Sequence, residues 1–158
     1  MHLRARTVAG TVVLLALAAC SAPAGGTPEQ ITAWIAEQDA ADQGTGTLGT
    51  ATSRVGPGDP EPSAGTGITL EYDAPARVDA VRVSCFGDGT LDFTVATTSA
   101  DDHDGSTTRD AEVTDVACGG DPVEIPLDAT GVTAVRTTGS GADRTGAWHA
   151  EILGTQPA

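Results

Sequence analysis

The chain has 158 residues, the length of a single domain, with 8 basic and 22 acidic residues and a formal net charge of −14. A surface of that sign repels phosphate backbones, which argues against nucleic-acid binding. Aromatic residues make up only 3% of the chain, so a core must be built mainly from Val, Leu, Ile and Ala. The composition therefore predicts a small acidic domain with no nucleic-acid partner.

The first 19 residues have the pattern of a secretory leader. Arg4 and Arg6 give a positive start, and residues 8–17 form an apolar segment. A helix of that length spans about 15 Å, roughly half of a bilayer core, so the segment is too short to cross a membrane. We expect a signal peptide over residues 1–19, whose removal leaves six arginines against 22 acids and a charge of −16.

The leader ends in the sequence Leu17, Ala18, Ala19 and Cys20. This sequence resembles the lipobox of bacterial lipoproteins. The resemblance implies that the Cys20 thiol receives a diacylglyceryl lipid, that cleavage falls before it, and that it becomes the mature N-terminus. Two acyl chains hold a protein on a bilayer, so the predicted location is the extracytoplasmic face of the cell membrane. The alternative is a plain signal peptide that a cysteine happens to follow.

With Cys20 occupied by lipid, Cys85 and Cys118 remain as an even pair in an oxidising compartment. We predict that they form a disulfide; two buried free thiols are the alternative. Neither cysteine has a CxxC spacing or a neighbouring histidine, so redox catalysis and zinc binding are poor interpretations.

A lipidated tether of small residues is expected over residues 20–26, followed by an amphipathic helix over residues 27–43. Thr27 is a suitable N-cap, and Gln30 completes a capping box with it. Apolar residues at helical spacing, Trp34 among them, form one stripe. The outer face is acidic, so we expect this stripe to pack on the following domain and not on anionic lipid.

Residues 44–66 are rich in Gly, Pro, Thr and Ser and predict a loop, with a weak strand over residues 48–53. From residue 67 the pattern becomes alternating, as in half-buried strands. Strands are expected at 68–72, 81–85, 91–95, 111–118, 123–127, 132–137 and 147–153. The pair Asp88-Gly89 predicts a hairpin between the second and third of these, and Pro126 predicts a strand at a sheet edge.

Many short strands with frequent turns predict an all-β fold over residues 67–158. We expect a small antiparallel β-sandwich, jelly-roll-like or an immunoglobulin-like variant, preceded by the N-terminal helix. In a true immunoglobulin domain the core tryptophan lies between the paired cysteines, whereas Trp148 follows both. This order favours the jelly-roll-like topology.

The mature chain also resembles a group of actinobacterial envelope lipoproteins of unknown function. The segments that carry the resemblance are "AWIAEQDAA", "GITLEYDAPARVDAVRVSCFG" and "GAWHAEIL". The resemblance implies an envelope location and a sandwich fold, and it implies no activity.

The acidic loop "SADDHDGSTTRD" is the strongest candidate for a metal site. Asp102 and Asp104 would occupy positions three and five of an EF-hand loop, but Ala100 and Ala111 then occupy positions one and twelve, where oxygen donors are required. A looser Ca²⁺ site that adds Asp101 is the alternative, and a solvated hairpin loop without metal is preferred.

The sequence offers weak candidates for two other kinds of site, a carbohydrate site and a catalytic site. Trp148 and Tyr72 could stack on a sugar ring, but Trp148 shares one face of its strand with apolar residues, which favours a core position. Ser84 and His149 carry no nucleophile signature such as GxSxG, so no catalytic residue is assigned.

The sequence therefore predicts a membrane-anchored lipoprotein whose β-sandwich is a non-catalytic binding or structural module of the cell envelope. Its partners would be the membrane, through the lipid, and an envelope protein or glycan, with no cofactor besides the lipid. The alternative is a module that binds Ca²⁺ or carbohydrate, and an envelope hydrolase is third.

Overall fold

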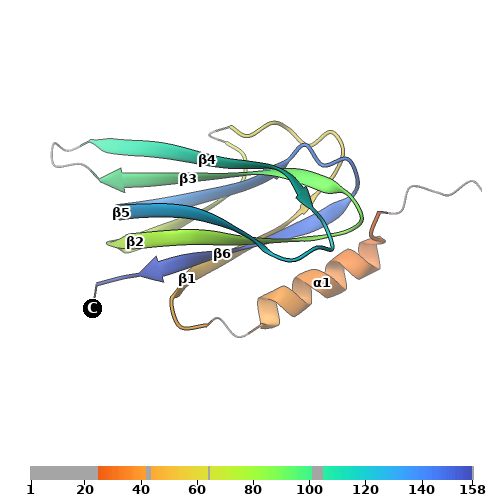
Figure 1. The fold of residues 1–158 in the computed structure, drawn as a ribbon, viewed down its shortest axis with the longest axis horizontal. Coiled ribbons are helices and arrows are strands. Elements are labelled where there is room, and N and C mark those ends of the chain that lie inside the picture. The colour runs from red at the N-terminus through yellow and green to blue at the C-terminus, as the bar shows by residue number, and fades with distance from the viewer. Residues whose placement is uncertain (1–24, 42–43, 64, 101–104, 158) are drawn as a thin grey trace, which may run out of the picture.

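A computed structural model describes residues 25–41, 44–63, 65–100 and 105–157 (Figure 1). One helix precedes six strands, which confirms the predicted all-β class with an N-terminal helix. The elements are α1 (Pro28–Ala40), β1 (Thr47–Val55), β2 (Ile68–Phe86), β3 (Thr90–Ala100), β4 (Ser106–Ala117), β5 (Val123–Ser140) and β6 (Gly146–Thr155).

The strands form one antiparallel sheet in the order β1-β6-β2-β5-β3-β4. Its two central strands are the longest, with 19 residues in β2 and 18 in β5. They pair from Ile68 opposite Thr137 to Val83 opposite Val123, and the register shifts three times between Glu71 and Ala80. Opposite these shifts, Asp128 (φ 48°) and Gly131 (φ 69°) adopt left-handed backbone conformations. Such irregularities bend paired strands, so the β2–β5 ribbon turns back on itself here.

The bend divides the sheet into two layers. The β1–β6 layer contains β1, β6 and the paired segments 76–86 of β2 and 123–131 of β5. The β3–β4 layer contains β3, β4 and the remaining halves of β2 and β5.

The two layers pack face to face as a sandwich. The rings of Phe93 on β3 and Trp148 on β6 meet edge to face with centroids 5.1 Å apart, although their strands are not neighbours in the sheet. The shared core consists mainly of small aliphatic side chains, as the composition predicted: Val78, Val81, Val83, Leu91, Val95, Val132, Val135 and Ile152 are each at most 1% exposed.

The molecule has two different ends along its strands (Figure 1). The turn end carries the β2–β3 turn, the β4–β5 turn, the β5–β6 loop and both ends of the β1–β2 loop. Backbone contacts hold these turns together: Cys118 N–H donates to the Gly89 carbonyl at 2.8 Å, and Asp143 N–H donates to the Thr90 carbonyl at 3.3 Å. The bend end carries the bend of the β2–β5 ribbon, the outer ends of β3 and β4, and the C-terminal end of β6.

The predicted Asp88-Gly89 hairpin is wrong. β2 pairs with β5 and β6, whereas β3 pairs with β4 and β5, so the turn between them passes from one layer to the other. A two-residue type I′ hairpin requires positive φ at both central residues, and in this turn only Gly87 has one, at 130°.

The weak strand predicted over residues 48–53 is present as β1, which is longer than predicted, so only the other described residues of 44–66 are loop. Its alternation was weak because Thr, Ser and Gly supply most of its side chains. The strands predicted at 68–72 and 81–85 are both part of β2, and those predicted at 123–127 and 132–137 are both part of β5. Bulges interrupt the alternation of side chains in these two strands without ending the pairing. Pro126 lies where β5 pairs with β2 alone in the described chain, which agrees with the predicted edge position.

Helix α1 lies against the outer side of the β1–β6 layer. Its predicted capping box is present, with Thr27 N–H donating to Gln30 Oε1 at 2.9 Å and Gln30 N–H donating to Thr27 Oγ1 at 3.3 Å. Ile31 is buried, and the Trp34 ring stacks on Phe86 with centroids 5.7 Å apart. In the described part of the chain, no helix is both long and apolar enough to cross a membrane.

Candidate functional site

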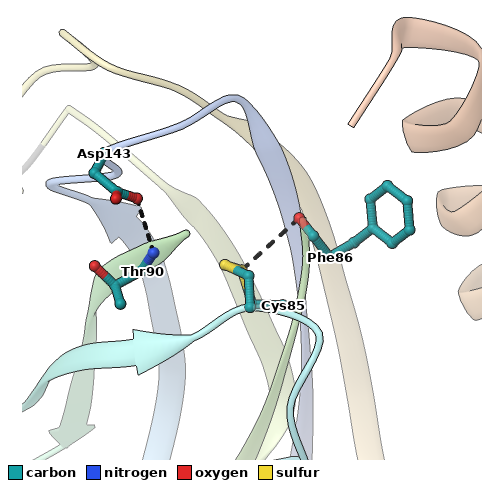
Figure 2. The surroundings of a disulfide bond; sticks show 5 residues. Cys85, Phe86, Thr90 and Asp143 are labelled. Carbon is teal, nitrogen blue, oxygen red and sulfur yellow. Dashed lines mark hydrogen bonds between the residues drawn. A yellow bond between two sulfur atoms is a disulfide. The ribbon is translucent and has the colours of Figure 1, made fainter. Parts of the chain in front are cut away.

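The predicted disulfide between Cys85 and Cys118 is present at the turn end, with Cα atoms 4.4 Å apart (Figure 2). Cys85 belongs to β2 in the β1–β6 layer, and Cys118 directly follows β4 in the other layer. Gly119 N–H donates to the Cys85 carbonyl at 2.7 Å beside the bond. The disulfide therefore joins the two layers at a point where the backbone is already held by hydrogen bonds.

Figure 2 shows the side chains around this bond. Asp143 Oδ1 accepts a hydrogen bond from Thr90 N–H at 2.8 Å, which ties the β5–β6 loop to the start of β3. Cys85 Sγ lies 4.0 Å from the Phe86 carbonyl oxygen, a packing contact, because a sulfur in a disulfide has no proton to donate. The Phe86 ring points away from the disulfide toward α1.

Cys20, the predicted lipidation residue, lies outside the described residues. The first described residue, Gly25, lies at the turn end, where a Cβ on it would come within 3.1 Å of the Thr145 carbonyl oxygen. A Cβ on Gly26 would lie 2.7 Å from the Phe86 ring, so only glycine fits there without displacing the ring. The chain therefore joins the domain between the β5–β6 loop and Phe86.

A polar cluster lies between α1 and the outer face of the β1–β6 layer. We call Asp39, Thr52, Arg82, His149 and Glu151 the helix-side cluster. Thr52 Oγ1 lies 2.8 Å from His149 Nδ1 and 3.3 Å from Asp39 Oδ1. When the single Thr52 hydroxyl proton is donated to Asp39, His149 Nδ1 must donate to Thr52, and His149 Nε2 is then left as an acceptor.

The charged groups of this cluster are well paired. Arg82 Nη1 lies 3.0 Å from Glu151 Oε2, and its Nη2 lies 3.6 Å from Glu124 Oε2. The other Glu151 oxygen, Oε1, accepts from the Thr47 hydroxyl at 2.6 Å. Both Glu151 oxygens therefore have partners, as expected for ion pairs that hold an outer sheet face in place.

The His149 imidazole is half-buried, and burial lowers its pKa because the charged form loses hydration there. The Glu151 and Asp39 carboxylates oppose this effect and act to raise the pKa. The net direction is downward from the ordinary value of 6.5, so the fold favours the neutral imidazole. A pocket of about 130 Å³ lies beside it, lined by Gln38, Thr50, Arg82 and Ser84 among others.

Ser84 and His149 lie directly opposite each other on β2 and β6. Nothing in the sequence pattern predicted this neighbourhood, because the partner of β2 could not be known from alternation alone. No hydrogen bond joins the two side chains, while His149 Nδ1 is bonded to Thr52. The pair therefore lacks the contact between nucleophile and base that defines a catalytic dyad.

Trp148 is a core residue, as its strand pattern favoured. It is 2% exposed, its ring meets Phe93, and Gly139 packs directly against the indole. Trp148 also contributes to the wall of a pocket of about 310 Å³, together with Ser53, Thr138 and Ile68 among others. With its faces covered, Trp148 cannot stack on a sugar ring, so the carbohydrate alternative through this residue is wrong.

The predicted weak metal candidates Asp101, Asp102 and Asp104 lie outside the described residues, so a Ca²⁺ site there stays a prediction. Among the residues that are described, no group of three or more His, Cys, Asp or Glu side chains is placed to hold a metal ion. Tyr72, the other aromatic candidate, has a buried hydroxyl without a hydrogen-bond partner, and burial raises its pKa to about 12.

Comparisons with protein families, with curated proteins and with solved structures find no match for this chain.

Proposed function

We propose that this chain is an exported lipoprotein, anchored by a lipid on Cys20 to the extracytoplasmic face of the cell membrane. Its β-sandwich serves as a non-catalytic binding or structural module of the envelope. The observation that carries the proposal is the Cys85–Cys118 disulfide between the two layers. Disulfides persist in oxidising compartments, and this one leaves Cys20 as the remaining cysteine of the chain.

The start of the described chain supports the same proposal. Cys20 precedes Gly25 by only five residues, and Gly25 and Gly26 already pack on the domain. A lipid on Cys20 would therefore be attached five residues before the point where the described chain meets the domain. Each buried methylene contributes about 0.8 kcal/mol to membrane binding, and two acyl chains suffice for stable attachment.

The non-catalytic role is supported by the state of the polar side chains. Arg82 and Glu151 are paired with each other, His149 is bonded to Thr52, and Ser84 has no hydrogen bond to His149. A catalytic site needs a base within hydrogen-bond reach of a nucleophile. The helix-side cluster instead links α1 to β1, β2 and β6, which is a structural task.

The test is metabolic labelling with palmitate in a bacterial host that processes lipoproteins. We expect label on the unsubstituted chain and none on Cys20→Ser. The double variant Cys85→Ser/Cys118→Ser is the matched control, because it removes the other two thiols and should keep the label. Equal labelling of the Cys20→Ser variant would overturn the proposal.

A further inference from the structure

We propose that the turn end of the sandwich faces the lipid bilayer and that the bend end projects away from it. The turn end, described above, also includes the start of α1, because Gly25 and Gly26 lie beside Thr145 and Phe86. The proposal rests on the proposed lipidation of Cys20, but it adds an orientation that lipidation alone does not determine.

The short link between Cys20 and the domain carries the proposal. Five residue steps separate Cys20 from Gly25, and even a fully extended chain of that length spans at most about 18 Å. Gly25 is fixed beside Thr145 on the β5–β6 loop, and Gly26 beside Phe86 at the end of β2. The turn end must therefore stay within about 18 Å of the lipidated residue.

The length of the strands then determines what is held away from the membrane. β3 and β4 run between the two ends, with 11 and 12 residues. At about 3.3 Å per residue, their outer ends lie roughly 35–40 Å from the turn end. This distance is about twice the reach of the link, so the two ends cannot exchange places by movement of the link.

The distribution of charge favours an end-on position over a sideways one. The link holds the turn end near the lipid in either position, although that end is itself acidic, with Glu29, Asp88, Asp121 and Asp143 against Arg144. A sideways position would also bring one long side to the lipid, and the rest of α1 exposes Glu37 and Asp39 with no basic residue. The exposed β4 face on the opposite side is also acidic, with Asp110, Glu112 and Asp115 against Arg109. Laying either side on an anionic leaflet would therefore add its negative charge to that of the turn end.

The chain allows a clean test because it contains no lysine. Three exposed threonines lie at different heights along the strands: Thr145 at the turn end, Thr114 on β4, and Thr107 near the outer end of β4. Each is changed to lysine alone, and the lipidated chain is labelled with an amine-reactive donor fluorophore. The unsubstituted chain, labelled in parallel, corrects for reaction at the N-terminus.

The labelled chains are bound to phosphatidylcholine vesicles that carry acceptor fluorophores on their headgroups, and energy transfer is measured. We expect transfer to be highest for Thr145→Lys, lower for Thr114→Lys and lowest for Thr107→Lys, whose label lies about 23 Å beyond that of Thr114. Equal transfer from the three labels, or the reverse order, on chains that float with the vesicles would overturn the orientation. Failure of the unsubstituted chain to float, or equal flotation of Cys20→Ser, would instead overturn the proposed lipid anchor.

Discussion

The two faces of β6 are made of alternating residues in one strand, yet different forces hold them. Trp148, Ala150 and Ile152 face inward and are at most 2% exposed, in a core of close-packed apolar side chains. His149 and Glu151 face α1, where hydrogen bonds and ion pairs connect them to neighbouring strands and to the helix. Burial of apolar surface contributes a large part of the free energy of folding, whereas the polar contacts are partly exposed and each contributes little. The sandwich should therefore carry most of the stability, and α1 should be the more weakly held element.

The two tryptophans give the largest and most direct test, since one lies on each side of the β1–β6 layer. Trp148→Ala should lower the free energy of unfolding by about 3–5 kcal/mol, because it leaves a cavity in the core. Trp34→Ala removes a half-exposed ring and should cost about 1 kcal/mol, the range of an aromatic pair. Urea denaturation of both variants measures the difference, and equal losses would contradict the division between core and helix.

The disulfide should contribute nearly as much as the core tryptophan. It closes a loop of 33 residues, for which loop-closure entropy gives about 3–4 kcal/mol. The Cys85→Ser/Cys118→Ser variant should lose that stability under non-reducing conditions, while Cys20→Ser should unfold at the same urea concentration as the unsubstituted chain. A double variant as stable as the original would mean that the turn-end hydrogen bonds already hold the layers together.

One buried group, the Tyr72 hydroxyl, lowers the stability that the core provides. The Tyr72 hydroxyl is buried without a hydrogen-bond partner, and an unsatisfied buried polar group costs about 1–3 kcal/mol. Tyr72→Phe keeps the ring and removes this oxygen, so we expect the free energy of unfolding to rise by about 1 kcal/mol. A decrease in thermal unfolding temperature would show that the hydroxyl has a partner in solution.

The outward face should give the smallest effect, and one that depends on pH. The pKa of His149 is lowered from 6.5, mainly by burial, so folding favours the neutral imidazole. Its stabilising contribution is fully present above pH 6.5 and is lost as the pH falls through the lower folded pKa. The measurement is the difference in urea midpoint between pH 7.5 and pH 5.

His149→Gln cannot titrate in this range, so this variant should lose less stability than the unsubstituted chain over the same change of pH. A steeper loss in the variant would mean that the Asp39 and Glu151 carboxylates outweigh burial and raise the pKa in the folded protein.

Local patterns predicted the elements well, and long-range partners poorly. The Thr27–Gln30 capping box and the alternation around Trp148 are properties of a few adjacent residues, and both are present in the structure. The Asp88-Gly89 pair also looked like a local signal, but the strands beside it found partners in different layers. Turn chemistry specifies a hairpin only when the two strands beside the turn pair with each other.

The helix-side cluster could not have been predicted for the same reason. Asp39 and Thr52 are 13 residues apart, and Thr52 and His149 are 97 apart. They meet because β1 pairs with β6 and α1 lies over both, and no pattern within any one segment encodes that arrangement. The alternation of β6 did predict that His149 points away from Trp148, which is the part of the geometry that a single strand determines.

The free edge of β4 has a consequence for how neighbouring copies would meet. Among the strands that the structure describes, β4 pairs only with β3, so its other edge has no strand beside it over 12 residues. Such an edge can pair with a strand of another molecule. The proposed lipid anchor would hold copies on one membrane surface, where they would collide often. Here a bulge lies in β4 between the partners of Leu91 and Phe93, and Asp115 within it has a left-handed conformation (φ 56°), so the edge is not flat and continuous. Together with the repulsion between its acidic side chains, this distortion should keep copies from joining into an extended β-aggregate.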